Sequence, residues 1–157
     1  MIRKTLIIIS IFIVIIFTYG HANVIQTDDF LASAIASIAA DATATNGSEF
    51  TSLELDLVSD DGLVNTDGIA TVEITFTGDG SMDGSNVEFY FQVSLDGTNW
   101  STDEYVKIYC ASDAEHVSDV VRHSEPITAK WKKIRLWKVF NDDAANEITD
   151  VNAKIAF

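Results

Sequence analysis

Cysteine is almost absent from this sequence. Cys110 is the only one among 157 residues, so the chain cannot form an internal disulfide bond. Stability must then come from a hydrophobic core, with help from a metal or a partner subunit. Cys110 lies in an alternating apolar run, which predicts a buried and unreactive thiol. The alternative is a disulfide bond to another chain.

Positive charge is also scarce. The sequence has 10 lysines and arginines against 24 aspartates and glutamates, for a formal net charge of −14. Nucleic acid and anionic membrane surfaces repel a protein this acidic, so neither is expected as a partner. The same excess of carboxylates favours solubility and the binding of divalent cations.

The residues needed for catalysis are few. His116 and His123 are the only histidines after residue 22, and the sequence contains no nucleophile-elbow pattern. In His123-Ser124-Glu125, neighbouring side chains on a strand would point to opposite faces, which does not align a nucleophile with its base. Many carboxylates fall on predicted solvent faces, whereas a catalytic acid needs a cleft that shifts its pKa. We predict that the protein is not an enzyme.

The N-terminus has the three parts of a secretory signal. Met1–Lys4 is a positive start, Leu6–Phe17 is an apolar run, and Gly20-His21-Ala22 fits the cleavage rule. We predict that residues 1–22 are a signal peptide removed before Asn23. The protein would then be secreted, extracellular or at the cell surface, with only transient membrane contact. A retained anchor is the alternative, but a spanning helix needs roughly 20 apolar residues.

Residues 23–46 are predicted to form an N-terminal helical segment. Thr27 is a candidate N-cap, and Asp28 and Asp29 suit the positive end of a helix over residues 27–40. Such an amphipathic helix would cover one end of its own domain or dock as an arm on a neighbour. Its apolar face would carry Phe30, Leu31, Ala34, Ile35, Ile38 and Ala39.

Beyond Gly47 the apolar period changes to two, which predicts strands with one face in a core and the other in water. About seven such strands, without helices between them, predict an all-β fold for residues 47–157. We expect an antiparallel β-sandwich of jelly-roll or Greek-key type. The expected strands lie at 53–57, 70–76, 87–95, 105–110, 116–122, 131–140 and 151–157.

Two segments resemble galactose-binding-like jelly-roll domains of the discoidin type. They are FQVSLDGTNW, from Phe91 to Trp100, and EPITAKWKKIRL, from Glu125 to Leu136. In that family a strand enters an S-x-DG-x-x-W turn, and a later strand reads P-x-x-AR-Y-I-R-I. The resemblance implies a jelly roll that binds carbohydrate or lipid. A similar hairpin occurs in small structural proteins of phage virions. From the residues alone, Asp96-Gly97 predicts a tight turn across which Trp100 folds back.

A calcium site is predicted in one acidic loop. Calcium takes about six to eight oxygen ligands from carboxylates, amides and carbonyls. Asx-turns made by the same polar residues are the alternative interpretation. A second loop at 79–86 is a weaker candidate of the same kind. The candidate ligands of the first loop are Asp60, Asp61, Asn65 and Asp67.

The stretch from Lys130 to Phe140 combines aromatic and cationic residues. It holds five of the ten lysines and arginines. If Ile134 and Leu136 point inward, Val139 and four larger residues share the other face. That face could be a set of solvated cation–π contacts, a protein interface, or a platform on which sugars stack. The four larger residues are Trp131, Lys133, Arg135 and Trp137.

These patterns predict a non-enzymatic, secreted or cell-surface structural protein that assembles with itself or mediates extracellular interactions. Its partner would be a second copy or a surface glycan. A secreted carbohydrate-binding module of galactose-binding-like type is the alternative function. Apart from structural calcium, no cofactor is expected.

Overall fold

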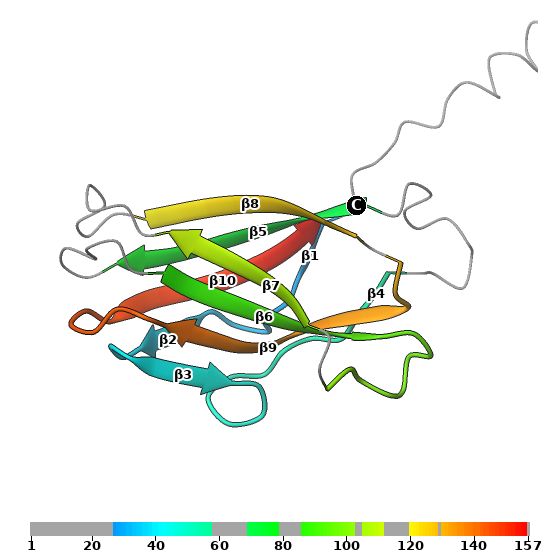
Figure 1. The fold of residues 1–157 in the computed structure, drawn as a ribbon, viewed down its shortest axis with the longest axis horizontal. Helices are drawn as coiled ribbons and strands as arrows, with labels where there is room; N and C mark the ends of the chain where they lie inside the picture. The colour runs from blue at the N-terminus through cyan, green and yellow to red at the C-terminus, as the bar shows by residue number, and fades with distance from the viewer. Residues whose placement is uncertain are drawn as a thin grey trace, which may run out of the picture.

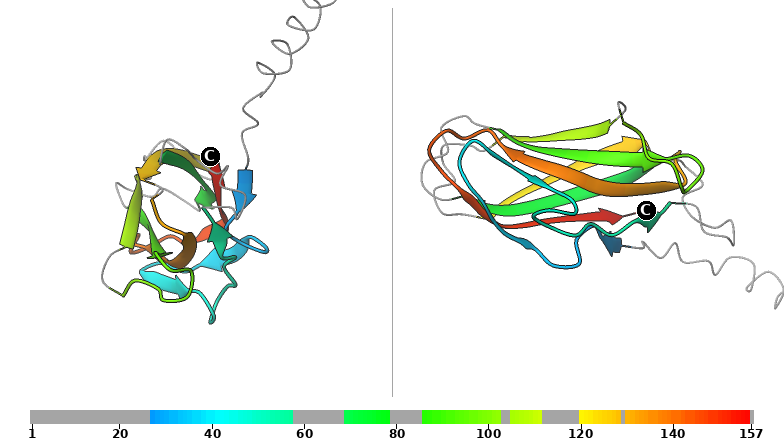
Figure 2. Two further views of the ribbon diagram at one scale, coloured as in Figure 1. Left: turned by 90° about the vertical axis from the view of Figure 1, so that its right-hand side faces the viewer. Right: turned by 90° about the horizontal axis from the view of Figure 1, so that it is seen from below.

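The structure is a computed structural model that describes residues 27–57, 69–78, 86–102, 105–111, 120–128 and 130–156. The described chain forms two antiparallel sheets that face each other (Figure 1), and Figure 2 shows this sandwich from its end and from below. The predicted signal peptide lies outside the described residues. The strands are β1 Thr27–Asp29, β2 Ile35–Ile38, β3 Ala42–Thr45, β4 Leu55–Asp56, β5 Ile69–Gly78, β6 Asn86–Ser94, β7 Tyr105–Ala111, β8 Val120–Thr128, β9 Lys133–Asn141 and β10 Ile148–Ala156.

The first sheet has the order β1-β10-β5-β8, with β2 also paired to β10. The second has the order β3-β9-β6-β7, with β4 also paired to β9. Every pairing between these strands is antiparallel. The predicted all-β antiparallel sandwich is therefore confirmed. The described residues form ten strands rather than about seven, because the three short strands β1, β2 and β3 carry too little alternation to be recognised.

The predicted helix over residues 27–40 is wrong, since the described residues contain no helix. Its four larger apolar residues, Phe30, Leu31, Ile35 and Ile38, do lie in the core, where strands and their connections place them. Phe30 and Leu31 are buried, whereas Ala34 and Ala39 are exposed. The backbone N–H of Phe30 donates to the carbonyl oxygen of Ala153 at 2.9 Å. The hydrogen bonds of this segment thus run to β10 rather than along a helix.

A β-bulge explains why the apolar spacing imitates a helix. Asp150 has φ 52°, and β10 carries one more residue than β5 at this point. The bulge brings Ile148 and Val151, three positions apart, into the core together. On the other side of β10, Ile35 pairs with Val151 and Ile38 with Ile148. Because β2 follows the bulged strand, its buried residues have the same spacing of three.

Five of the predicted strands agree with the structure to within a few residues, and these are β5, β6, β7, β9 and β10. The strand expected at 116–122 instead runs from Val120 to Thr128, and residues 112–119 lie outside the described chain. The strand expected at 53–57 is only β4. There Leu55 and Leu57 are buried, but Leu53 is 40% exposed, so the alternation does not extend that far.

The core lies between the two sheets and is built from the inward positions of the strands. The ring centres of Phe30 and Phe91 are 4.9 Å apart. Cys110 is fully buried, as predicted. Burial, followed by the negative charge of Glu125, raises the pKa of its thiol to about 12. None of the described residues forms a helix long and apolar enough to cross a membrane.

Candidate interaction face

The outer surface of β6, β7 and β9 carries cations that lie over aromatic rings. At its centre Tyr90 of β6 pairs across strands with Lys107 of β7 and with Lys138 of β9. The two Nζ atoms lie 4.7 and 4.2 Å from the centre of the Tyr90 ring. Lys107 also lies 4.2 Å from the ring of Tyr109, and Lys138 lies 5.0 Å from that of Trp137. We call the following set the cation–aromatic face: Tyr90, Trp100, Lys107, Tyr109, Arg135, Trp137 and Lys138.

Glu88 holds Lys107 in place at the β7 side of this face. Its carboxylate accepts a hydrogen bond from the Tyr90 hydroxyl and forms an ion pair with Lys107 at 2.8 Å. Burial alone would raise the pKa of Glu88, but the hydrogen bonds from Lys107 and Tyr90 lower it overall. Burial would likewise lower the pKa of Lys107, yet the hydrogen bond to Glu88 raises it overall. Both groups therefore stay charged at neutral pH.

A second β-bulge shapes the β9 side. Phe91 pairs with Leu136 and Tyr90 with Lys138, so Trp137 is an extra residue in β9. The bulge leaves both Trp137 and Lys138 half-buried and turns Val139 into the core. The prediction that Val139 lies on the outer face is therefore wrong, because strict alternation assumes an unbroken strand.

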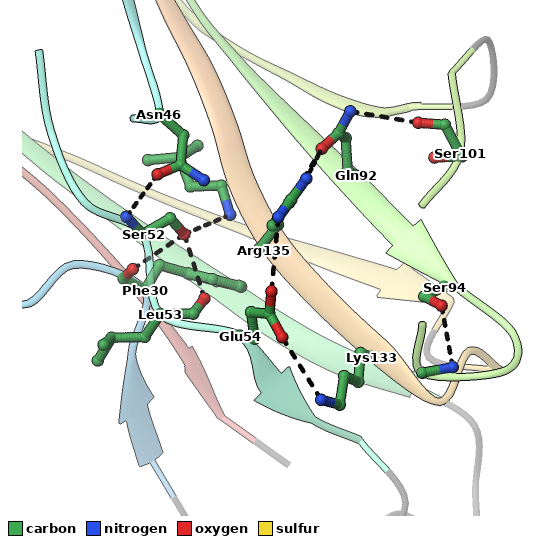
Figure 3. A network of polar contacts seen from close by, with 12 residues as sticks. Phe30, Asn46, Ser52, Leu53, Glu54, Gln92, Ser94, Ser101, Lys133 and Arg135 are labelled. Atoms are coloured by element: carbon green, nitrogen blue, oxygen red, sulfur yellow. Dashed lines mark hydrogen bonds and ion pairs between the residues drawn. The ribbon is translucent and has the colours of Figure 1, made fainter. Parts of the chain in front are cut away.

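Arg135 connects β9 to three other parts of the chain, and Figure 3 shows two of these contacts, to Gln92 and Glu54. Its Nε and Nη2 atoms donate to Oε1 of Gln92 at 2.9 and 2.7 Å. Its guanidinium carbon lies 4.1 Å from the centre of the Trp100 ring. Glu54 accepts from Arg135 at 3.5 Å and from Lys133 at 3.4 Å. This one carboxylate therefore joins two cations of β9.

The structure brings together only part of the predicted set. Lys133 and Arg135 meet at Glu54, and Trp137 lies with Lys138. Trp131 stands apart, half-buried against the core. Sequence reasoning missed the contributions of Tyr90, Lys107 and Tyr109, although the alternation of β6 and β7 places them on outward positions. The missing information was that β6 lies between β7 and β9.

Trp131 instead lines a hollow at the β6–β7 hairpin. Gly97 has φ 81°, which confirms the positive φ expected of a tight turn at Asp96-Gly97. A Cβ atom there would lie 3.1 Å from the flexible Lys132 side chain, which could shift, so the positive φ is the main reason for glycine. The hollow has a volume of about 340 Å³. It is lined by Val93, Leu95, Asp96, Asn99, Trp100, Ser101 and Trp131.

The predicted calcium ligands Asp60, Asp61, Asn65 and Asp67 all lie outside the described residues. Within the ranges that the structure does describe, no three histidine, cysteine or acidic side chains group as a metal site would require. His123 and Glu125 lie 3.4 Å apart on one face of β8, while the intervening Ser124 is exposed.

No protein-family model and no curated protein sequence matches this chain. Among solved structures it is similar to PRD1 vertex protein P5, with 14% identity, a TM-score of 0.37, and coverage of 84% of this chain and 94% of that one. It is also similar to the CBM22-1 xylan-binding domain from Paenibacillus barcinonensis Xyn10C, with 10% identity, a TM-score of 0.35, and the same two coverages. A third similarity, to the VP2 subviral particle of infectious bursal disease virus, has 7% identity and a TM-score of 0.26, and covers 85% of this chain and 40% of that one. At such scores these similarities carry no argument about function.

Proposed function

We propose that this is an exported, non-enzymatic structural protein whose copies assemble through the cation–aromatic face. The observation that carries the proposal is the gathering of Lys107, Arg135 and Lys138 over aromatic rings of one sheet. The rest of the protein is strongly acidic, with a formal net charge of −14 overall. A cationic surface on an acidic molecule suits an acidic partner surface.

The chemistry of this face favours contact with protein. Tyrosine, tryptophan and arginine are the residues that anchor protein interfaces. Their side chains are already held in place by cation–π contacts and by Glu88, so little side-chain entropy remains to be lost on binding. Sugar stacking needs an uncovered ring, whereas Tyr90, Tyr109 and Trp137 each have a lysine Nζ atom within 5.0 Å of the ring centre.

The second copy offers an acidic end that complements the face. Asp41, Asp142 and Glu147 are exposed, and the backbone N–H of Asp41 donates to the Asp143 carbonyl oxygen at 2.8 Å. The β2–β3 turn therefore lies beside the β9–β10 loop, and the sequence has no lysine or arginine from Val139 to Ala153. Because a face-to-end contact joins different surfaces of each copy, it can repeat along a chain of molecules.

We also infer that the strand order is of jelly-roll type. The main strands lie in the orders β1-β10-β5-β8 in one sheet and β3-β9-β6-β7 in the other. Along the chain, each of these strands is usually followed by a strand of the opposite sheet. Jelly rolls build viral capsids and lectins, in which the sandwich presents a surface to a partner. The exported location rests on the predicted signal peptide, residues 1–22.

Light scattering over a range of concentrations tests the proposal. The protein would be the chain begun at Asn23, which retains all the described strands. We expect a mass that rises with concentration beyond a dimer, and that falls toward the monomer in about 1 M salt because ions screen the contact. Trp137→Ala and Arg135→Glu should both abolish the rise.

Arg122→Glu is the matched control. Arg122 lies on β8 of the other sheet, and its side chain is 68% exposed. The substitution Arg122→Glu changes the net charge by the same amount as Arg135→Glu. It should assemble like the unchanged protein. A fixed monomer mass for the unchanged protein would overturn the proposal, as would equal losses in Arg122→Glu and Arg135→Glu.

A further inference from the structure

The hollow at the β6–β7 hairpin shares Trp100 with the cation–aromatic face, but its other lining residues lie outside that face. The hairpin that carries it lies at the end of the sandwich where β6 ends and β9 begins, opposite the β9–β10 loop (Figure 1). The hollow's volume of about 340 Å³ falls at the small end of the range of roughly 300–1,000 Å³ for small-molecule sites. Like those sites, it has mostly apolar and aromatic walls with a few polar groups.

The polar wall of the hollow is held in place before any ligand arrives. Oδ1 of Asp96 accepts from the backbone N–H groups of Thr98 and Asn99 at 2.8 and 2.7 Å, and from the Ser94 hydroxyl at 3.1 Å. Oδ2 accepts from the side-chain amide of Asn99 at 2.6 Å. The backbone N–H of Asn99 is the first cause that holds the pKa of this carboxyl far below its ordinary value. Asp96 is therefore a charged acceptor, and its Oδ2 atom has room for one more donor.

The aromatic wall is fixed as well. The Arg135 guanidinium lies over the ring of Trp100, and Trp131 packs against the core. The hydroxyl of Ser101 accepts from the backbone N–H of Val93 at 3.2 Å, which ties the returning chain of the hairpin to β6. Two indole side chains and a row of acceptors thus line one rigid hollow.

The mixture of groups selects the chemical class of the ligand. The carboxylate of Asp96 disfavours an anion, and the Lys132 side chain close to Gly97 disfavours a cation. A wholly apolar ligand would desolvate the Asp96 carboxylate and leave the remaining acceptor position of its Oδ2 atom without a donor. A neutral ring with apolar C–H faces and several hydroxyl donors satisfies both walls, because its faces suit indoles and its hydroxyls suit carboxylate and amide oxygens.

We propose that this hollow binds the pyranose or furanose ring of a neutral sugar. This site shares only Trp100 with the cation–aromatic face, and the inference does not depend on assembly. A dissociation constant on the order of 1 mM is expected for a single ring, because a small ligand has few non-hydrogen atoms to contribute binding energy. The acceptors would take hydroxyl protons, while the indoles of Trp100 and Trp131 pack on the ring.

Saturation-transfer NMR with the full chain tests the site. The probes are methyl glycosides of neutral hexoses and pentoses and their tetrasaccharides. Leu95 lines the hollow but is 78% exposed, so Leu95→Arg should fill the hollow without unfolding the protein. We expect about tenfold weaker binding or none in that variant. The matched control is Ile69→Arg, at an apolar residue 59% exposed on β5, which should bind as the unchanged protein does.

Trp137→Ala separates this site from assembly, because it removes an indole outside the hollow. It should keep sugar binding even where assembly is lost. The inference is overturned if none of the probes binds, or if Leu95→Arg binds as well as Ile69→Arg. The inference is also overturned if Leu95→Arg loses assembly while the unchanged protein binds no sugar. That result would show that the hollow receives an apolar side chain from a neighbouring copy.

Discussion

The guanidinium carbon of Arg135 lies 4.1 Å from the centre of the Trp100 ring and so fastens the β6–β7 hairpin to β9. The same guanidinium donates twice to the side-chain oxygen of Gln92, which is buried. Arg135 thus belongs to the cation–aromatic face on one side and orients a wall of the sugar hollow on the other.

This contact predicts a measurable coupling between the two residues. In a double-mutant cycle of Arg135→Ala and Trp100→Ala, urea unfolding should give an interaction energy of about 0.5–1 kcal/mol, typical of a half-exposed cation–π pair. The cycle cancels the separate loss of the Gln92 hydrogen bonds, which is common to both backgrounds. Additive effects of the two substitutions would show that the guanidinium and the indole lie side by side without a stabilising interaction.

The N-terminal segment can be tested at one buried and one exposed residue. Phe30 is fully buried against Phe91, so Phe30→Ala should cost about 3–5 kcal/mol of unfolding free energy. Ala34 is exposed, so Ala34→Lys should change stability by no more than about 0.5 kcal/mol. A helix with both residues on one buried face would make Ala34→Lys strongly destabilising, and urea unfolding distinguishes these outcomes.

Asn141 holds the β9–β10 loop in place. Its side-chain amide donates to the carbonyl oxygens of Ala39 at 3.1 Å and Asn146 at 2.8 Å, and its oxygen accepts from the backbone N–H of Asp143 at 3.2 Å. Because Asn141 is fully buried, Asn141→Ala leaves these groups without partners and should cost about 1–3 kcal/mol. The neighbouring exposed Asp142→Asn should cost less than about 0.5 kcal/mol in the same urea experiment.

The pKa of Asp96 predicts a stability that depends on pH. Backbone hydrogen bonds from Asn99 and Thr98 lower the folded pKa below the ordinary value of 3.8. Asp96 therefore stabilises the hairpin fully above the unfolded pKa, and this contribution is lost as the pH falls toward the folded pKa. The stability difference between the unchanged protein and Asp96→Asn should shrink below about pH 4. A difference that stays constant from pH 7 to strong acid would contradict the assignment, and carbon NMR of the carboxyl group checks its pKa directly.

The sequence by itself determined the features that depend on local spacing. The alternation in β5, β6 and β10 predicts strands because side chains of a strand point to opposite faces in turn. Asp96-Gly97 predicts its turn because only glycine takes a positive φ without strain. The apolar neighbours of Cys110 were enough to predict its burial.

Only the tertiary structure decided the rest. Residues spaced by three occur on a helix and also beside a bulge, and the pairing of β2 with bulged β10 selects the strand. The bulge at Trp137 moves Val139 from the outer face to the core, and a strictly periodic pattern cannot predict such an extra residue. The order β9-β6-β7 places Tyr90 between Lys107 and Lys138, and the fold brings Trp131 to the hairpin of Trp100. These relationships join residues far apart in the chain, so they depend on which strands pair and in which register, and local propensity does not specify either.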